Sequence, residues 1–115
     1  MTFELSAHAC GSMLVISMRG QLDVADAVNA MTAVTDLPVK GRCVVIELAA
    51  LDFIDCFALN ALLEMRARVR LAGGDVRLAA PHERVRRLLA VTGIDRTFPA
   101  YRTVADAAAA GRAYA

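Results

Sequence analysis

The sequence has no tryptophan, and aromatic residues make up only 5% of its 115 residues. Proteins that bind single-stranded nucleic acid stack bases on aromatic side chains, so this scarcity argues against that class. An excess of positive charge is also missing, because 13 Lys and Arg residues face 12 Asp and Glu residues and the formal net charge is +1. Without a strong positive field, we expect no nucleic-acid partner. Several arginines have the spacing of solvated helix faces, namely Arg66, Arg68, Arg70, Arg84, Arg86 and Arg87.

Long apolar runs are missing too, although 57% of the residues are hydrophobic. Charged residues interrupt every apolar stretch well before the roughly 18 residues that a membrane span needs. The N-terminal segment MTFELSAHAC contains no basic region followed by an apolar run, which is the pattern of a secretory signal. We therefore expect no direct membrane insertion and a cytoplasmic location.

Cysteine and histidine are too few and too scattered for a disulfide-stapled or metal-bound fold. Cys10, Cys43 and Cys56 are an odd number of thiols at wide spacing, which predicts neither a disulfide framework nor a paired zinc half-site. His8 lies near Cys10, but the other histidine, His82, is far along the chain and no second ligand cluster accompanies either. We predict free thiols, no metal and no cofactor.

Hydrophobic periodicity predicts strands that alternate with helices after an initial hairpin turn at Gly11 and Ser12. The run at 43–48 is apolar and rich in β-branched residues, which is typical of a strand in the middle of a sheet. This order predicts one α/β domain over residues 1–115, with a mixed β-sheet and flanking helices. The expected strands are 2–7, 12–20, 43–48, 75–80 and 96–101, and the expected helices are 24–36, 56–72, 81–93 and 104–115.

The segment FIDCFALNALLEM, residues 53–65, places an acid and a thiol where a strand passes into a helix. Asp55 can accept hydrogen bonds from the unpaired N–H groups of the first turn, as an N-cap does, and Asp23 precedes the helix at 24–36 in the same way. Together the two acids could form a local acidic patch. The helix start favours the thiolate of Cys56, whereas the neighbouring carboxylate disfavours it. Because a catalytic base is missing, we predict a small, moderately buried side chain at Cys56.

Phe57 falls on the polar side of the same helix, beside Asn60 and Glu64. It lies opposite an apolar stripe that consists of Ala58, Leu62, Met65, Val69 and Ala72, with Leu59 and Leu63 widening it, and the glycines Gly73 and Gly74 end the helix in left-handed geometry. A large aromatic side chain on a polar helix face is expected to be shielded from water by another part of a protein. Two interpretations are open, a loop of the same chain that folds over Phe57 or a partner that uses it as an anchor.

Four motifs in this order resemble the STAS family, the sulfate transporter and anti-sigma factor antagonist domains. They are GQLDVADA at 20–27, CVVIELAALDFIDCFALNALL at 43–63, AGGDVRLAAP at 72–81 and VRRLLAVTGIDRTFP at 85–99. The resemblance covers nearly the whole chain, and the fold that it implies is a central sheet with helices on its sides.

The resemblance also implies a function, that of a non-catalytic regulator that binds an anti-sigma factor of the ATP-binding kinase type and frees a sigma factor. Related antagonists carry a serine directly after the acid that matches Asp55, and the partner kinase phosphorylates it. Cys56 occupies that position here, which implies binding without the phosphoserine switch. The residues expected to bind the partner are Asp23, Asp55, Cys56, Phe57 and Asn60.

Two other functions stay open. STAS domains also serve transport systems, so the chain could be an accessory subunit of a membrane transport assembly. The hypothesis from a different class is a thiol-based redox sensor at Cys56. Its position at a helix start favours this hypothesis, whereas the missing base and the missing resolving cysteine oppose it.

Overall fold

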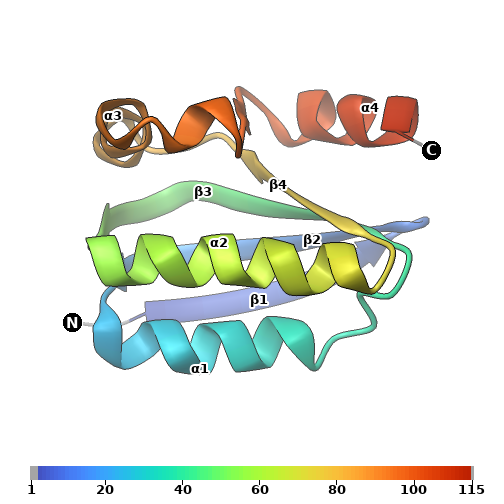
Figure 1. Ribbon diagram of the computed structural model, residues 1–115, viewed down its shortest axis with the longest axis horizontal. Coiled ribbons are helices and arrows are strands. Elements are labelled where there is room, and N and C mark those ends of the chain that lie inside the picture. The colour runs from blue at the N-terminus through green and yellow to red at the C-terminus, as the bar shows by residue number, and fades with distance from the viewer. Residues whose placement is uncertain (1–2, 115) are drawn as a thin grey trace.

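A five-stranded β-sheet forms the centre of the computed structural model, which describes the backbone of residues 3–114 and side chains up to residue 110 (Figure 1). The strands are β1 (Phe3–Cys10), β2 (Met13–Leu22), β3 (Cys43–Ile54), β4 (Asp75–Ala79) and β5 (Ala100–Tyr101). They lie side by side in chain order, β1 is antiparallel to β2, and the other neighbours are parallel. The prediction of a mixed sheet with the apolar run of residues 43–48 in its central strand is therefore confirmed.

Helices cover both faces of this sheet. They are α1 (Val24–Thr35), α2 (Cys56–Leu71), α3 (Glu83–Thr92) and α4 (Val104–Tyr114), with a short 3-10 helix η1 at Ile94–Arg96. Figure 1 shows α1 and α2 side by side on one face of the sheet. Helix α4 contacts β3, β4 and β5, and its Ala107 packs with Val45 and Ala79 in a second, smaller core. The predicted fold class is confirmed, whereas the assignment of residues 1–115 to one domain stays a prediction.

The main core lies under α1 and α2, where the predicted apolar faces meet. The β2 residues Leu14, Ile16 and Met18 share one buried face, as their alternation predicts. From α2, the predicted stripe residues Ala58, Leu62, Met65 and Val69 are buried together with Leu59, whereas Leu63 and Ala72 are only partly covered.

The two glycines after α2 have different roles, which corrects the prediction that both are left-handed. Gly73 has a φ of +85°, so it provides the predicted left-handed stop. Gly74 is needed for a close approach instead, because a Cβ atom there would lie 2.3 Å from the Arg42 carbonyl oxygen. Any larger residue at Gly74 would push apart the two chain segments that enter β3 and β4.

Several element boundaries differ from the prediction. Strand β1 continues to Cys10 and β2 to Leu22, beyond the predicted ends at residues 7 and 20. Strand β3 continues to Ile54, beyond the predicted end at residue 48, and its pairing with β2 absorbs two register shifts. The last strand contains only Ala100 and Tyr101, because η1 and the fully buried Phe98 take up part of the predicted segment 96–101. Helix α3 begins after Pro81, since His82 Nδ1 accepts a hydrogen bond from the Arg84 backbone N–H at 3.2 Å and acts as the N-cap.

A buried polar cluster joins α2, β4 and β5. Asp75 is 5% exposed and Arg77 is 7% exposed. Arg66 Nε donates to Asp75 Oδ1 at 3.2 Å, Arg77 Nη2 lies 3.6 Å from Asp75 Oδ2, and Arg77 Nη1 donates to the Tyr101 hydroxyl at 3.0 Å. Arg66 also lies over the Phe98 ring, 5.0 Å from its centroid. The prediction that Arg66 belongs to a solvated helix face is therefore wrong, because this arginine bridges the helix and the sheet.

Candidate partner-binding surface

Asp23 and Asp55 lie at the same edge of the sheet, each directly after a strand and directly before a helix. Leu22 and Ile54 are paired residues at the ends of β2 and β3, and the Asp55 N–H donates to the Leu22 carbonyl at 3.3 Å. Parallel strands bring their carboxyl ends to one edge, so this pairing also brings together the starts of α1 and α2. The sequence alone did not fix this neighbourhood, because it depends on the register of two strands.

Both acids act as N-caps, as predicted. Asp23 Oδ1 accepts hydrogen bonds from the N–H groups of Ala25 at 3.0 Å and Asp26 at 3.2 Å. Asp55 Oδ1 accepts one from the Ala58 N–H at 2.7 Å. The carboxylates are thus held by otherwise unpaired helix donors, which fixes the position of both helix starts. Both side chains remain partly accessible at the edge.

Cys56 is the first residue of α2, and its side chain is exposed. The prediction of a moderately buried side chain is therefore wrong. The N-cap turn points the thiol away from the sheet, while the next inward positions of the helix, Ala58 and Leu59, fill the core. A modifying enzyme or a partner could reach position 56 directly.

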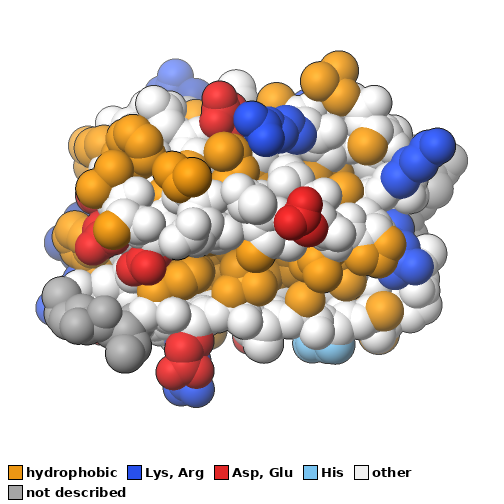
Figure 2. Space-filling view, turned by 90° about the horizontal axis from the view of Figure 1, so that it is seen from below, with side chains coloured by type: hydrophobic (Ala, Val, Ile, Leu, Met, Phe, Trp, Pro, Cys, Tyr) orange, Lys and Arg blue, Asp and Glu red, His pale blue; other side chains and the backbone are white. Residues whose placement is uncertain are grey.

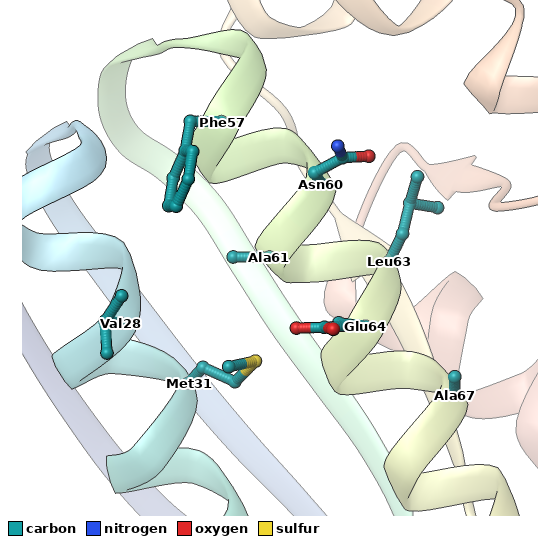
Figure 3. A pocket seen from close by; sticks show the side chains of 8 residues that line it. All are labelled: Val28, Met31, Phe57, Asn60, Ala61, Leu63, Glu64 and Ala67. Carbon is teal, nitrogen blue, oxygen red and sulfur yellow. The ribbon is translucent and has the colours of Figure 1, made fainter.

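Phe57 is also uncovered, with 53% of its surface exposed. No loop of residues 3–114 folds over it. The interpretation that a loop of the same chain covers Phe57 is therefore wrong, and the interpretation that a partner covers it stays open. The close view in Figure 3 shows its ring leaning from α2 toward α1, while Met31 points from α1 back toward α2. Asn60, a further predicted contact residue on this helix, is exposed one turn further along.

A groove of about 590 Å³ runs between α1 and α2, and Phe57 and Asn60 line it. The remaining lining residues are mostly apolar, namely Val28, Met31, Ala61, Leu63, Glu64 and Ala67. Figure 3 shows that Val28 and Met31 come from α1 and the other residues from α2. The groove thus begins at the sheet edge that carries the two capping acids.

Further exposed apolar side chains surround this edge. Val24 is 52% exposed, Val28 50% and Phe53 45%. In Figure 2, hydrophobic side chains gather at the left end, where α1 and α2 begin, with acidic side chains beside them. Sequence analysis missed these three residues, although the spacing of Val24 and Val28 by four positions on one helix face was an available signal. We call Val24, Val28, Phe57 and the acids Asp23 and Asp55 the edge surface.

The other two cysteines lie at the far end of the strands. Cys43 begins β3 and pairs with Met13, which in turn pairs with Cys10 across the hairpin, whereas Cys56 follows the end of β3. All three thiols are free. Burial raises the pKa of the Cys43 thiol, and the nearby Arg77 guanidinium only partly opposes this shift. Cys56 therefore has no second cysteine close enough to resolve an oxidised thiol.

No group of three or more His, Cys, Asp and Glu side chains within residues 3–114 could hold a metal ion. In that same part of the chain, no helix is long and apolar enough to cross a membrane.

Comparison with known proteins finds one family. A model of the STAS domain matches residues 4–107. The anti-sigma-F factor antagonist RsfA of Mycobacterium tuberculosis is 31% identical, in a match that covers 86% of this chain and 80% of RsfA. A TM1081 homolog from Thermotoga neapolitana is 33% identical over 64 residues, so the chain spans only 57% of that relative.

A solved structure extends the similarity to the fold. The crystal structure of an anti-sigma factor antagonist from Mycobacterium paratuberculosis matches with a TM-score of 0.85 and 26% identity, and the match covers 96% of this chain and 95% of that one. The sheet and its flanking helices are thus shared over nearly the full length of both chains.

Proposed function

Because the chain belongs to the STAS domain family and is similar to anti-sigma factor antagonists, we propose that it binds an anti-sigma factor of the ATP-binding kinase type in the cytoplasm and frees a sigma factor. Anti-sigma factor antagonists bind anti-sigma factors and are non-catalytic. The mechanism is competition. An anti-sigma factor that is occupied by this protein no longer holds its sigma factor, which then joins RNA polymerase by mass action.

The exposed edge surface is the observation that carries this proposal. Its large apolar side chains are about half exposed, and Phe57 has 53% of its surface exposed. A partner that covers them removes this apolar surface from water. Asp23 and Asp55 flank them with negative charge, so a partner with apolar pockets and basic groups at their rim fits best. Asn60 adds an amide that can both donate and accept a hydrogen bond.

Position 56 decides how the complex is regulated. The thiol of Cys56 is exposed directly after the capping acid Asp55, and we infer that it takes the position at which related antagonists present a serine hydroxyl. An ordinary protein kinase transfers phosphate to a hydroxyl group, so the partner kinase would bind this surface without modifying it. The interaction would then persist in the presence of ATP, and another signal would have to end it.

The two alternative functions have less support from the geometry. A redox sensor at Cys56 would need a resolving thiol, and Cys10 and Cys43 lie at the opposite end of β3. An accessory role in a membrane transport assembly has no specific observation in its favour.

The test is a reconstitution with purified anti-sigma kinases from the same organism, each loaded with a fluorescently labelled sigma factor. Addition of this protein should release the sigma factor from one of them, seen as a fall in fluorescence anisotropy, equally with and without ATP. If no anti-sigma kinase binds the protein, the proposal is wrong. If the sigma factor is released but ATP reverses the release with phosphate attached at residues 55–60, only the absence of a switch is wrong.

A further inference from the structure

The outer edge of β1 is long and open. Within residues 3–114, this eight-residue strand pairs only with β2, so its outward N–H and C=O groups face solvent along the edge of the sheet. The opposite edge strand, β5, has just two residues and contacts α4. Proteins usually protect an edge strand by shortness, proline or charged side chains, and of these the eight-residue segment FELSAHAC has only the charge of Glu4.

The two faces of β1 differ in chemistry. Leu5, Ala7 and Ala9 are paired with Met18, Ile16 and Leu14, whose side chains belong to the main core, so this face of β1 lies on the side of α1 and α2. Figure 2, which views the molecule from below, shows a band of hydrophobic side chains along the middle of the view. The other face carries Glu4, Ser6 and His8, which are all exposed.

We propose that the β1 edge binds the β1 edge of a second copy of this chain. The two strands would run antiparallel about a twofold axis at Ser6 and join two five-stranded sheets into one continuous sheet. The backbone groups of both edges would gain hydrogen-bond partners, and the partly buried side chains of Phe3 and Leu5 would be covered further.

Complementary side chains favour a second copy of this chain as the partner, and they favour the register with the twofold axis at Ser6. With the axis at Ser6, Glu4 of each copy lies opposite His8 of the other copy, so two pairs of an acid and a base form on the polar face. On the apolar face, Phe3 lies opposite Ala9 and Leu5 opposite Ala7, so each large side chain meets a small one.

The two neighbouring registers with the same facing are less complementary. An axis at Ala7 would place Glu4 opposite Cys10 and Ser6 opposite His8, and an axis at Leu5 would place Glu4 opposite Ser6 and Leu5 opposite itself. Neither register pairs Glu4 with His8. A shift of the pairing by a single residue would place the polar face of one copy beside the apolar face of the other copy. The strand is therefore self-complementary about Ser6 in both charge and size.

The test measures the mass of the full-length protein by sedimentation velocity over a concentration series, with two single variants. His8→Glu places an acid opposite Glu4 twice in each dimer, so dimerisation should weaken about tenfold or more. Glu4→Lys should weaken it as well, because the introduced lysine then lies opposite His8. Ala90→Glu, at an exposed position of α3, is the matched control for added negative charge and should dimerise as wild type does.

A mixture of the two variants separates this interface from a folding defect. In a heterodimer, the introduced lysine faces the introduced glutamate while the native Glu4 and His8 face each other, so mixing should restore dimers that neither variant forms alone at that concentration. Amide hydrogen exchange along Phe3–Cys10 in the wild type should slow as concentration rises. A wild-type protein that stays monomeric up to millimolar concentration, or a mixture that stays monomeric, would overturn the proposal.

Discussion

Replacement of Phe57 by aspartate tests whether the edge surface is the docking site. Phe57 is 53% exposed, and a fully buried aromatic side chain covers about 150–250 Å², so a partner would cover roughly 100 Å² of it. At about 25 cal/mol per Å², this area contributes about 2.5 kcal/mol to binding. Since about 1.4 kcal/mol is a tenfold change in affinity, Phe57→Asp should weaken binding of the anti-sigma factor roughly fiftyfold.

The same substitution should leave the fold intact. Phe57 lies in the first turn of α2, where a negative charge is stabilised by the helix dipole by about 0.3–1 kcal/mol. Exposed substitutions away from special features usually change the free energy of unfolding by less than about 0.5 kcal/mol. The midpoint of thermal unfolding, followed by circular dichroism, should therefore stay close to that of the wild-type protein.

Two variants of the same helix serve as controls for this measurement. Leu71→Asp makes the same type of change at a 90% exposed position at the other end of α2, and it should affect neither affinity nor stability strongly. Leu62→Asp puts a charge at a position that is 1% exposed and should unfold the protein, because even Leu→Ala in a core costs about 2–5 kcal/mol. If Phe57→Asp binds as tightly as Leu71→Asp, the docking site lies elsewhere on the molecule.

Three further predictions concern the phosphate acceptor, the thiols and the buried charges, and the last of them has an exposed ion pair as its control. Incubation with the cognate anti-sigma kinase and ATP should leave the wild type unmodified and should add one phosphate to Cys56→Ser, as mass spectrometry would show; a phosphorylated wild type would contradict this. The pKa of Cys43 is raised by burial, so its thiolate fraction at any pH below that pKa is smaller, and its maleimide labelling in the folded protein should rise at higher pH than in the urea-unfolded protein. Asp75→Ala removes the carboxylate that two arginines contact, and urea unfolding should show a loss of about 3 kcal/mol or more. Glu83→Ala breaks an exposed pair with an N–O distance of 3.6 Å and should cost less than about 1 kcal/mol.

Local signals in the sequence were sufficient for the order of the elements and for both helix caps. Asp23 and Asp55 were predictable as caps because the hydrogen bonds that they accept come from residues two or three positions ahead. The length of β3 was not predictable in this way, since the pattern after residue 48 loses its alternation where the pairing with β2 shifts register. The burial of Arg66 was not predictable either, because it depends on the hydrogen bond to Asp75, and only tertiary packing sets the position of Asp75 relative to α2.

The edge surface shows the same limit at the level of function. The sequence identified Phe57 as an aromatic residue on a polar helix face, but a single helix cannot show what stands beside it. The pairing of Leu22 with Ile54 places α1 next to α2, and only then do Val28 and Met31 become the opposite wall of the groove that Phe57 lines. A docking surface assembled across two helices in this way requires both walls to remain in place. Substitutions that displace α1, such as Val34→Asp at a fully buried position, should therefore abolish partner binding even though they leave every predicted contact residue unchanged.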